Sequence, residues 1–457
     1  MIKPRQMSHH PSLSIRSNGR AACMVLSGFM LLASLPILSA QSRNPRILLE
    51  EIDRLALQKE AAIISWRQDI HEHPELGNRE FRTAEKVAEH LRSLGMEVKT
   101  GVGHTGVVGL LRGGMPGPVV ALRADMDALP VTEAVDLPFA SKARTTYNGK
   151  EVGVMHACGH DCHTAMLMGA AAILAELRDS LPGTVKFIFQ PAEEGSPEGE
   201  RGGASLMIEE GVLEDPEPEV IFGQHIFTDW EVGRIGYRPG AAMASPSSLR
   251  ITVRGSQTHG AYPWKGIDPI VVSSQIILAL QTITSRQLEL TKAPAVITIA
   301  TISGGVRSNI IPSEVTMSGT IRTFDADMQK EIRERIERTV VKIAESAGAT
   351  AEIRISGGTP MTRNDPELTT RMVPALERVT GKENLILCKP HTGAEDFSAY
   401  AQKIPGLFIF LGVRSPGTDP EDAVPLHSPH LIVDEGALIV GTRALASLAV
   451  EYMLGKY

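Results

Sequence analysis

The pattern that most constrains the fold is the alternation of short apolar runs with segments of helical periodicity. Apolar runs bounded by glycine and proline at 107–111 and 119–122 predict buried strands. Further alternation follows as a helix from about 163 to 178, a strand at 184–189, a helix near 204–210 and a strand at 220–223. This order predicts an α/β domain with a mostly parallel sheet and helices on both of its faces.

The same domain is predicted to resume near the C-terminus. Before the first strand, apolar spacing from Leu48 to Leu94 predicts two helices separated by a turn at 73–77. The later elements are a helix at 366–379, a strand at 407–411, a loop containing His427 and a final helix at 434–454.

A different unit interrupts this domain. Its expected order is strand 249–253, helix 269–285, strands 295–302 and 314–322, helix 328–347 and strand 350–355. The order βαββαβ is the ferredoxin-like motif. We therefore expect an inserted lid or dimerisation domain at 243–355, flanked by two parts of a catalytic domain at 41–242 and 356–457 and preceded by a leader at 1–40.

The leader carries Lys3, Arg5, Arg16 and Arg20 and no acidic residue, and an apolar run from 21 to 38 follows. This pattern predicts a signal peptide cleaved after Ala40 and hence an exported protein, periplasmic or secreted. The alternative is an uncleaved anchor, because about 18 apolar residues approach the length of a membrane span. No other segment is expected to be long and apolar enough to cross a bilayer, so no stable membrane association is expected after cleavage.

Composition narrows the class of protein. The 457 residues include 46 Lys and Arg and 53 Asp and Glu, for a net charge of −7. An acidic balance without a basic stripe argues against nucleic acid as a partner and favours a soluble enzyme. Loss of Cys23 with the leader leaves Cys158, Cys162 and Cys388, an odd number that argues against a disulfide framework.

The segment 155–163 holds the densest chemistry, with three histidines and two cysteines in nine residues. These side chains bind divalent transition metals, and neighbouring glycines predict a loop before a helix that Asp161 or Thr164 caps. Taken alone, the segment would also be compatible with a structural zinc site, a Cys158–Cys162 disulfide or chance, in place of a catalytic metal site.

Three polar clusters follow predicted strands, at 123–127, 190–194 and 224–225. Ligands of open parallel sheets bind outside the carboxyl ends of the strands, so these clusters predict the location of a site. Glu193 and Glu194 follow an apolar strand, where one carboxylate would ligate a metal and the other would act as general base. His225 and His427 are weak signals taken singly.

Together these motifs resemble the metal-dependent amidohydrolase family of hippurate hydrolases, N-acyl-amino-acid amidohydrolases and indole-acetyl-amino-acid hydrolases, which is similar to the carboxypeptidase-G-type metallopeptidases. The resemblance covers essentially the whole mature chain. It is carried by HEHPELGNRE (71–80), RADMDALP (123–130), GVMHACGHDCHTAM (153–166), GTVKFIFQPAEEG (183–195), GQH (223–225), GSQTHGAYP (255–263), SNIIP (308–312), GTIRT (319–323), GAEDFS (393–398) and LHSP (426–429).

The resemblance implies a site for two divalent metal ions, zinc or manganese, with cobalt or nickel also suited to mixed ligation. The implied ligands are Cys158, which looks like the bridging ligand, with His160, Glu194, His225 and His427. Glu193 is then the implied general base, and Asp125 a carboxylate that orients a ligand, plausibly His160.

The inserted domain supplies the implied substrate contacts His259, Asn309 and Arg322. The resemblance implies that His259 is catalytic and reaches the substrate carbonyl in a neighbouring subunit of a homodimer. An arginine near the site suits a substrate with a free carboxylate, because its planar fork binds one bidentately.

We therefore expect hydrolysis of the amide bond of N-acyl or N-aroyl amino acids, which are small-molecule substrates. The nearest alternative is an exported dipeptidase or carboxypeptidase on the same scaffold. From another class, the chain would be a catalytically silent binding protein, which the presence of all five ligands and the base disfavours.

Overall fold

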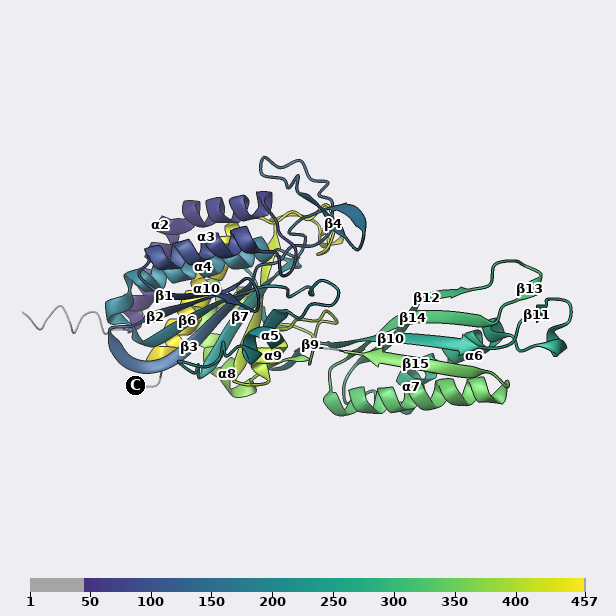
Figure 1. Cartoon of the computed structure of the whole chain (residues 1–457). Helices are drawn as coiled ribbons and strands as arrows, with labels where there is room; N and C mark the ends of the chain where they lie inside the picture. Colours follow the sequence, from purple (N-terminus) through teal and green to yellow (C-terminus); the bar gives the residue numbers. More distant parts are fainter. Residues whose placement is uncertain (1–44, 358, 456–457) are drawn as a thin grey trace, which may run out of the picture. The chain divides into compact units, whose positions relative to one another are not determined.

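The computed structural model describes residues 45–357 and 359–455 (Figure 1). The predicted leader, its cleavage site after Ala40 and Cys23 lie outside the described residues.

An eight-stranded sheet forms the centre of the larger domain, in the order β1-β2-β6-β3-β7-β18-β8-β17. The pairs β6–β3, β3–β7, β7–β18 and β8–β17 are parallel, whereas β1–β2, β2–β6 and β18–β8 are antiparallel. This confirms the mostly parallel sheet and adds strands that the apolar runs did not indicate. The strands are β1 (Glu97–Val102), β2 (Gly106–Arg112), β3 (Met115–Asp125), β6 (Pro182–Gln190), β7 (Val220–Glu231), β8 (Ile235–Tyr237), β17 (Leu385–Leu387) and β18 (Gly406–Arg414).

Helices pack on both faces of this sheet, as the alternation predicted. Side chains alternate along a strand, so Leu407 and Ile409 of β18 enter one core and Phe408 and Phe410 the other. The first core includes residues of α2 (Pro45–Glu72), α3 (Phe81–Ser93), α4 (His160–Glu176), α8 (Pro366–Thr380) and α10 (Gly436–Leu454), and the second those of α5 (Gly203–Glu209) and α9 (Phe397–Ala401).

Helix α10 corrects one expectation about membranes. Among the described residues, α10 is the helix that is long and apolar enough to cross a bilayer. The expectation that only the leader has such a segment was wrong. However, 72% of its most apolar window is buried inside the fold, where it contacts α2, α4 and α8. Apolarity around a whole helix is also the signature of a core helix, and burial indicates that role here.

The inserted segment forms a second sheet of four antiparallel strands in the order β12-β14-β10-β15. Its elements are β10 (Ser245–Arg254), α6 (Pro269–Thr282), β12 (Ala295–Gly304), β14 (Glu314–Thr323), α7 (Ala326–Ser346) and β15 (Thr350–Ser356), the predicted βαββαβ order. Leu249, Ile251 and Val253 of β10 share a core with residues of α6 and α7. Asp268 and Asp325 cap these two helices by accepting backbone N–H bonds.

In the part of the chain that the structure describes, three pairs of short strands lie outside these two sheets. They are the hairpin β4 (Arg144–Tyr147) and β5 (Lys150–Gly153), the pair β9 (Gly240–Met243) and β16 (Thr362–Asn364), and the pair β11 (Thr258–His259) and β13 (Ile310–Ile311).

The start of α4 differs from the prediction. The helix begins at His160, and Gly159 occupies the cap position with φ 85° and no side-chain cap. A Cβ at Gly159 would lie 2.2 Å from Ile226 Cδ1, so both backbone and space require glycine. The predicted caps are wrong, because Asp161 faces Arg67 and the Thr164 hydroxyl donates to the Asp125 carbonyl.

Candidate metal centre

The five predicted ligands lie together at the carboxyl ends of the parallel strands. Ligand atoms of Cys158, His160 and His225 lie within 4.8 Å of one another, as do those of Cys158, Glu194 and His427. Cys158 Sγ is 3.3 Å from His225 Nε2 and 3.2 Å from His427 Nε2. Cys158 therefore belongs to both groups and lies close to two of the ligand histidines.

Backbone contacts fix the segments that carry these ligands. The His427 N–H donates to Ala157 O over 2.7 Å, which holds the loop before α10 against the loop that carries Cys158. His225 does not end its strand as we expected, because β7 continues to Glu231. It lies inside β7 in register with Phe410 of β18.

His160 has the environment of a metal ligand. Its Nδ1 lies 3.2 Å from Asp127 Oδ1, and its buried Nε2 has no partner within the described residues. Metal-binding histidines commonly give one ring nitrogen to a carboxylate and the other to the ion. Buried polar atoms normally have a hydrogen-bond partner. The unpartnered Nε2 of His160 therefore fits a position where it would bind a cation.

His163 is placed differently, although the sequence puts it in the same motif. Its Nδ1 lies 2.6 Å from Asp125 Oδ1, and its Nε2 accepts the Ile226 N–H over 2.9 Å. Both ring nitrogens are therefore occupied, which excludes His163 as a ligand in this arrangement.

This geometry corrects the role expected of Asp125. Its Oδ1 lies 3.8 Å from His160 Nδ1 but 2.6 Å from His163 Nδ1, so Asp127 is the hydrogen-bonding partner of His160. In addition, the two oxygens of Asp127 accept the N–H groups of Glu193 and Glu194, each over 3.0 Å. Sequence reasoning missed Asp127, although it lies two residues from Asp125 in the same quoted motif.

Glu193 lies among further carboxylates that we had not assigned. Its group with Glu395 and Asp396 has oxygens within 4.8 Å of one another, and its Oε1 accepts the Asp396 N–H over 3.2 Å. Burial first, and then Glu395 and Asp396, raise the pKa of the Glu193 carboxyl well above its usual range. A raised pKa suits a carboxylate that must take up a proton.

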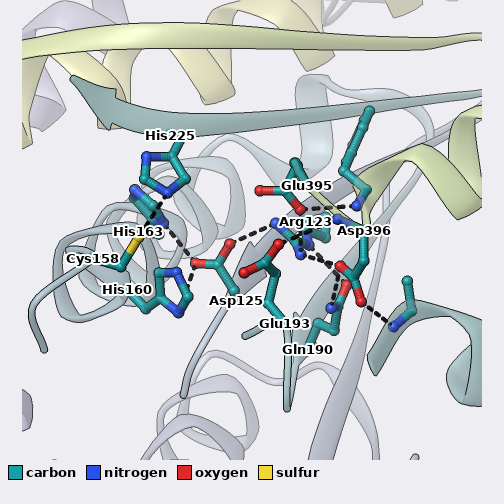
Figure 2. A network of polar contacts seen from close by, with 12 residues as sticks. Arg123, Asp125, Cys158, His160, His163, Gln190, Glu193, His225, Glu395 and Asp396 are labelled. Atoms are coloured by element: carbon teal, nitrogen blue, oxygen red, sulfur yellow. Dashed lines mark hydrogen bonds and ion pairs between the residues drawn. The ribbon is translucent and has the colours of Figure 1, made fainter. Parts of the chain in front are cut away.

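A buried arginine balances part of this negative charge. Arg123 is 1% exposed and pairs with Asp125 at 2.6 Å, Asp396 at 2.9 Å and Glu395 at 3.0 Å. Figure 2 shows Asp125 between two groups of side chains, with His163 on one side and Arg123 on the other. A single arginine thus pairs with three of the carboxylates that surround the general-base candidate.

The donor set fits divalent transition ions better than a disulfide. Cys158, Cys162 and Cys388 are all free, which contradicts the Cys158–Cys162 disulfide. Burial first, and then Glu194 and Glu193, raise the pKa of the Cys158 thiol well above its usual range. Without a cation, this cluster of buried thiol, carboxylate and imidazole groups is poorly stabilised. Thiolate, imidazole and carboxylate are the ligands that zinc and related transition ions bind.

The sequence model of peptidase family M20/M25/M40 matches residues 121–451. The chain belongs to this family. Among its relatives, thermostable carboxypeptidase 2 of Saccharolobus solfataricus is 42% identical over 408 residues, covering 89% of this chain and 99% of the relative. N-acetyl-L-cysteine deacetylase of Bacillus subtilis is 37% identical over 380 residues, covering 83% and 85%.

A solved structure agrees with these relatives. A dinuclear metal-binding M20 peptidase of Bacillus subtilis superposes with a TM-score of 0.71 at 36% identity, covering 86% of this chain and 98% of that one. The expected family and fold are confirmed. As a member of family M20/M25/M40, the chain is a metal-dependent amidohydrolase.

In this M20 chain, the donor cluster opens into a cavity of about 560 Å³. Arg322 lines it together with Cys158, Glu193, Glu194, His225 and His427. The other two predicted substrate residues are not among the residues that line it. His259 lies in β11 and pairs with Ile310 of β13. Asn309 directly precedes β13, and its carbonyl accepts the Gly260 N–H over 2.9 Å.

Proposed function

We propose that the protein hydrolyses the amide bond of N-acyl or N-aroyl amino acids, releasing a carboxylic acid and an amino acid. The observation that carries this proposal is the position of Glu193, a half-buried carboxylate beside the Cys158 cluster in a cavity that Arg322 also lines. The set combines a cation site, a proton acceptor and a cationic group for a substrate carboxylate.

The chemistry divides among these residues. Two divalent ions, held by Cys158, His160, Glu194, His225 and His427, would polarise the amide carbonyl and lower the pKa of the attacking water. Glu193 takes a proton from that water while the oxygen of the water bonds to the acyl carbon. Glu193 then returns the proton to the nitrogen as the C–N bond breaks. Asp127 holds Glu193 in place through its backbone N–H.

The experiment that tests this function is a hydrolysis panel with the metal-reconstituted protein. Zinc, manganese, cobalt and nickel are each supplied, and acyl group and amino acid are varied separately. Hydrolysis of blocked acyl amino acids would support the proposal. No hydrolysis with any of the four ions would overturn it.

A second candidate function is that of a carboxypeptidase or dipeptidase, favoured by the relative named a thermostable carboxypeptidase. The same panel separates the two functions. Cleavage of dipeptides with a free amine and no cleavage of blocked acyl amino acids would favour the peptidase.

Replacement of Arg322 with methionine is expected to raise KM for an acyl amino acid by about 10- to 100-fold. The reason is the loss of charge-assisted hydrogen bonds to the substrate carboxylate. Steady-state kinetics with the acyl amino acid and with its neutral amide measure this effect. An equal rise in KM for both compounds would contradict carboxylate recognition.

We propose further that the inserted domain, 243–355, acts as a lid and forms a homodimer, in which His259 reaches the partner's site and contacts substrate with Asn309. In support, β12 is an edge strand, and Val271 and Leu278 of α6 are 54% and 71% exposed. Light scattering is expected to give twice the mass of one chain. A monomer that hydrolyses substrate at full rate would contradict the role of His259.

We also propose that residues 1–40 direct export and are removed after Ala40, on the strength of the basic leader and its apolar run. N-terminal sequencing of protein from the periplasm or medium would then begin at Gln41. Recovery of the intact chain from the membrane fraction would instead favour an anchor.

A further inference from the structure

Three aromatic rings lie on the wall of the cavity next to the ligand cluster. The ring centroids of His391 lie 4.4 Å from Phe227 and 4.7 Å from Phe410, and those of the two phenylalanines lie 5.7 Å apart. All three side chains line the same cavity as Cys158 and Glu193. We call Phe227, His391 and Phe410 the aromatic wall.

Strand register places this wall next to the reacting centre. Phe227 follows His225 by two residues in β7, so both side chains point to the same face, about 7 Å apart along the strand. Phe410 pairs directly with His225 in the neighbouring strand β18. The wall therefore begins beside a ligand histidine, on the same face of the sheet.

His391 contributes a ring and no charge to this wall. Its N–H donates to Ala242 O over 2.8 Å and its carbonyl accepts the Ala244 N–H over 3.1 Å, which fixes its backbone beside β9. Its buried Nε2 has no partner within the described residues. Burial lowers the pKa of His391, which favours the uncharged imidazole beside the two phenylalanine rings.

The lining of the cavity thus combines two chemically different kinds of side chain. Arg322 is a cation suited to the carboxylate of an amino acid, and Phe227, His391 and Phe410 present uncharged rings, with Met243 beside them. Aromatic groups pack on one another by offset or edge contacts at such distances. The rings are therefore suited to the part of the substrate that lies away from its carboxylate.

We propose that the aromatic wall binds the acyl group of the substrate and makes the enzyme selective for flat aromatic acyl groups over acetyl. This inference rests on the proposed function, because it takes the scissile amide to lie between the wall and Arg322. Phe227 is the specificity-determining residue that contributes most, since it is only partly buried while Phe410 is 1% exposed.

The test compares benzoylglycine with acetylglycine, which differ only in the acyl group. The wild-type enzyme is expected to prefer benzoylglycine in kcat/KM. Phe227→Ala is expected to lower kcat/KM for benzoylglycine by about tenfold or more, because pocket contacts of this size discriminate by that much, and to change acetylglycine by less than about threefold. Phe227→Leu, which keeps most of the volume without the ring, should show a smaller loss in the same direction.

A matched control is Phe81→Ala, because Phe81 is 64% exposed on α3 and is not among the residues that line the cavity. This variant should leave the ratio of the two substrates unchanged. Equal losses for both substrates in Phe227→Ala, or a ratio unchanged in both Phe227 variants, would overturn the inference.

A binding measurement separates this inference from the proposed function. Calorimetry gives the affinity of benzoylglycine for the metal-loaded Glu193→Gln variant with and without Phe227→Ala. If the affinity depends on Phe227 but the wild-type enzyme hydrolyses no acyl amino acid, the aromatic wall is supported and the proposed function is overturned. If the wild type hydrolyses acyl amino acids but the affinity does not depend on Phe227, the function is supported and the aromatic wall is overturned. If there is neither hydrolysis nor a dependence on Phe227, both proposals are overturned.

Discussion

Glu193→Gln is expected to lower kcat by about 10²–10⁴-fold while the metal content of the protein stays unchanged. Glutamine keeps the size of the side chain and its acceptance of the Asp396 N–H but cannot take a proton. Glu194, in contrast, lies 3.0 Å from His427 Nε2 and within the group that includes Cys158. Kinetics and metal analysis of the same preparation measure both effects.

Two comparisons sharpen this prediction. Glu194→Gln is expected to lose metal together with activity, because it removes a ligand charge. Glu198→Gln makes the same chemical change at an exposed position of the same loop and should alter neither. Equal loss of metal and activity in Glu193→Gln would assign Glu193 to the ligands and contradict its role as general base.

The location of the site follows from local sequence, and the reason is geometric. Carboxyl ends of parallel strands meet at one edge, so Asp125 at the end of β3, the glutamates after β6 and His225 in β7 had to come close together. The apolar runs specify those strands without any tertiary information. Which glutamate is base and which is ligand came from the family resemblance alone, because adjacent carboxylates are equivalent in spacing.

Which carboxylate pairs with which histidine within the motifs could not be predicted in this way. Asp125 and Asp127 are both polar residues at the end of one strand, and only three-dimensional contacts give Asp125 to His163 and Asp127 to His160. The burial of Arg123 among carboxylates is likewise invisible in a pattern of apolar positions, because charged residues are usually exposed. The absence of a side chain at Gly159, before α4, leaves room for Ile226, which is far away in sequence.

Asp161→Asn is expected to lower the free energy of unfolding by about 3–5 kcal/mol at neutral pH, the usual cost of breaking a buried ion pair. Asp161 is fully buried, and its Oδ2 accepts from Arg67 Nε over 2.7 Å and lies 2.8 Å from His71 Nδ1. Arg67 is itself 3% exposed. Asparagine would leave a buried guanidinium without its closest anion. Denaturant unfolding of both proteins measures the difference.

A matched control is Asp53→Asn, because Asp53 also pairs with arginines, Arg378 and Arg443, but is 36% exposed. Solvent screens such pairs, so this variant should lose no more than about 1 kcal/mol. A loss in Asp161→Asn no larger than in Asp53→Asn would contradict the argument from burial.

The dependence on pH gives a second check on Asp161. Burial alone would raise the pKa of Asp161, but Arg67 and His71 outweigh it and hold this pKa well below its usual value of about 3.9. A depressed pKa stabilises the folded state at every pH above the unfolded value, and the stabilisation is lost as pH falls toward the folded value. The difference between wild type and Asp161→Asn should therefore shrink as the pH falls below about 4. A difference that grows below pH 4 would mean that Asp161 is held in its neutral form.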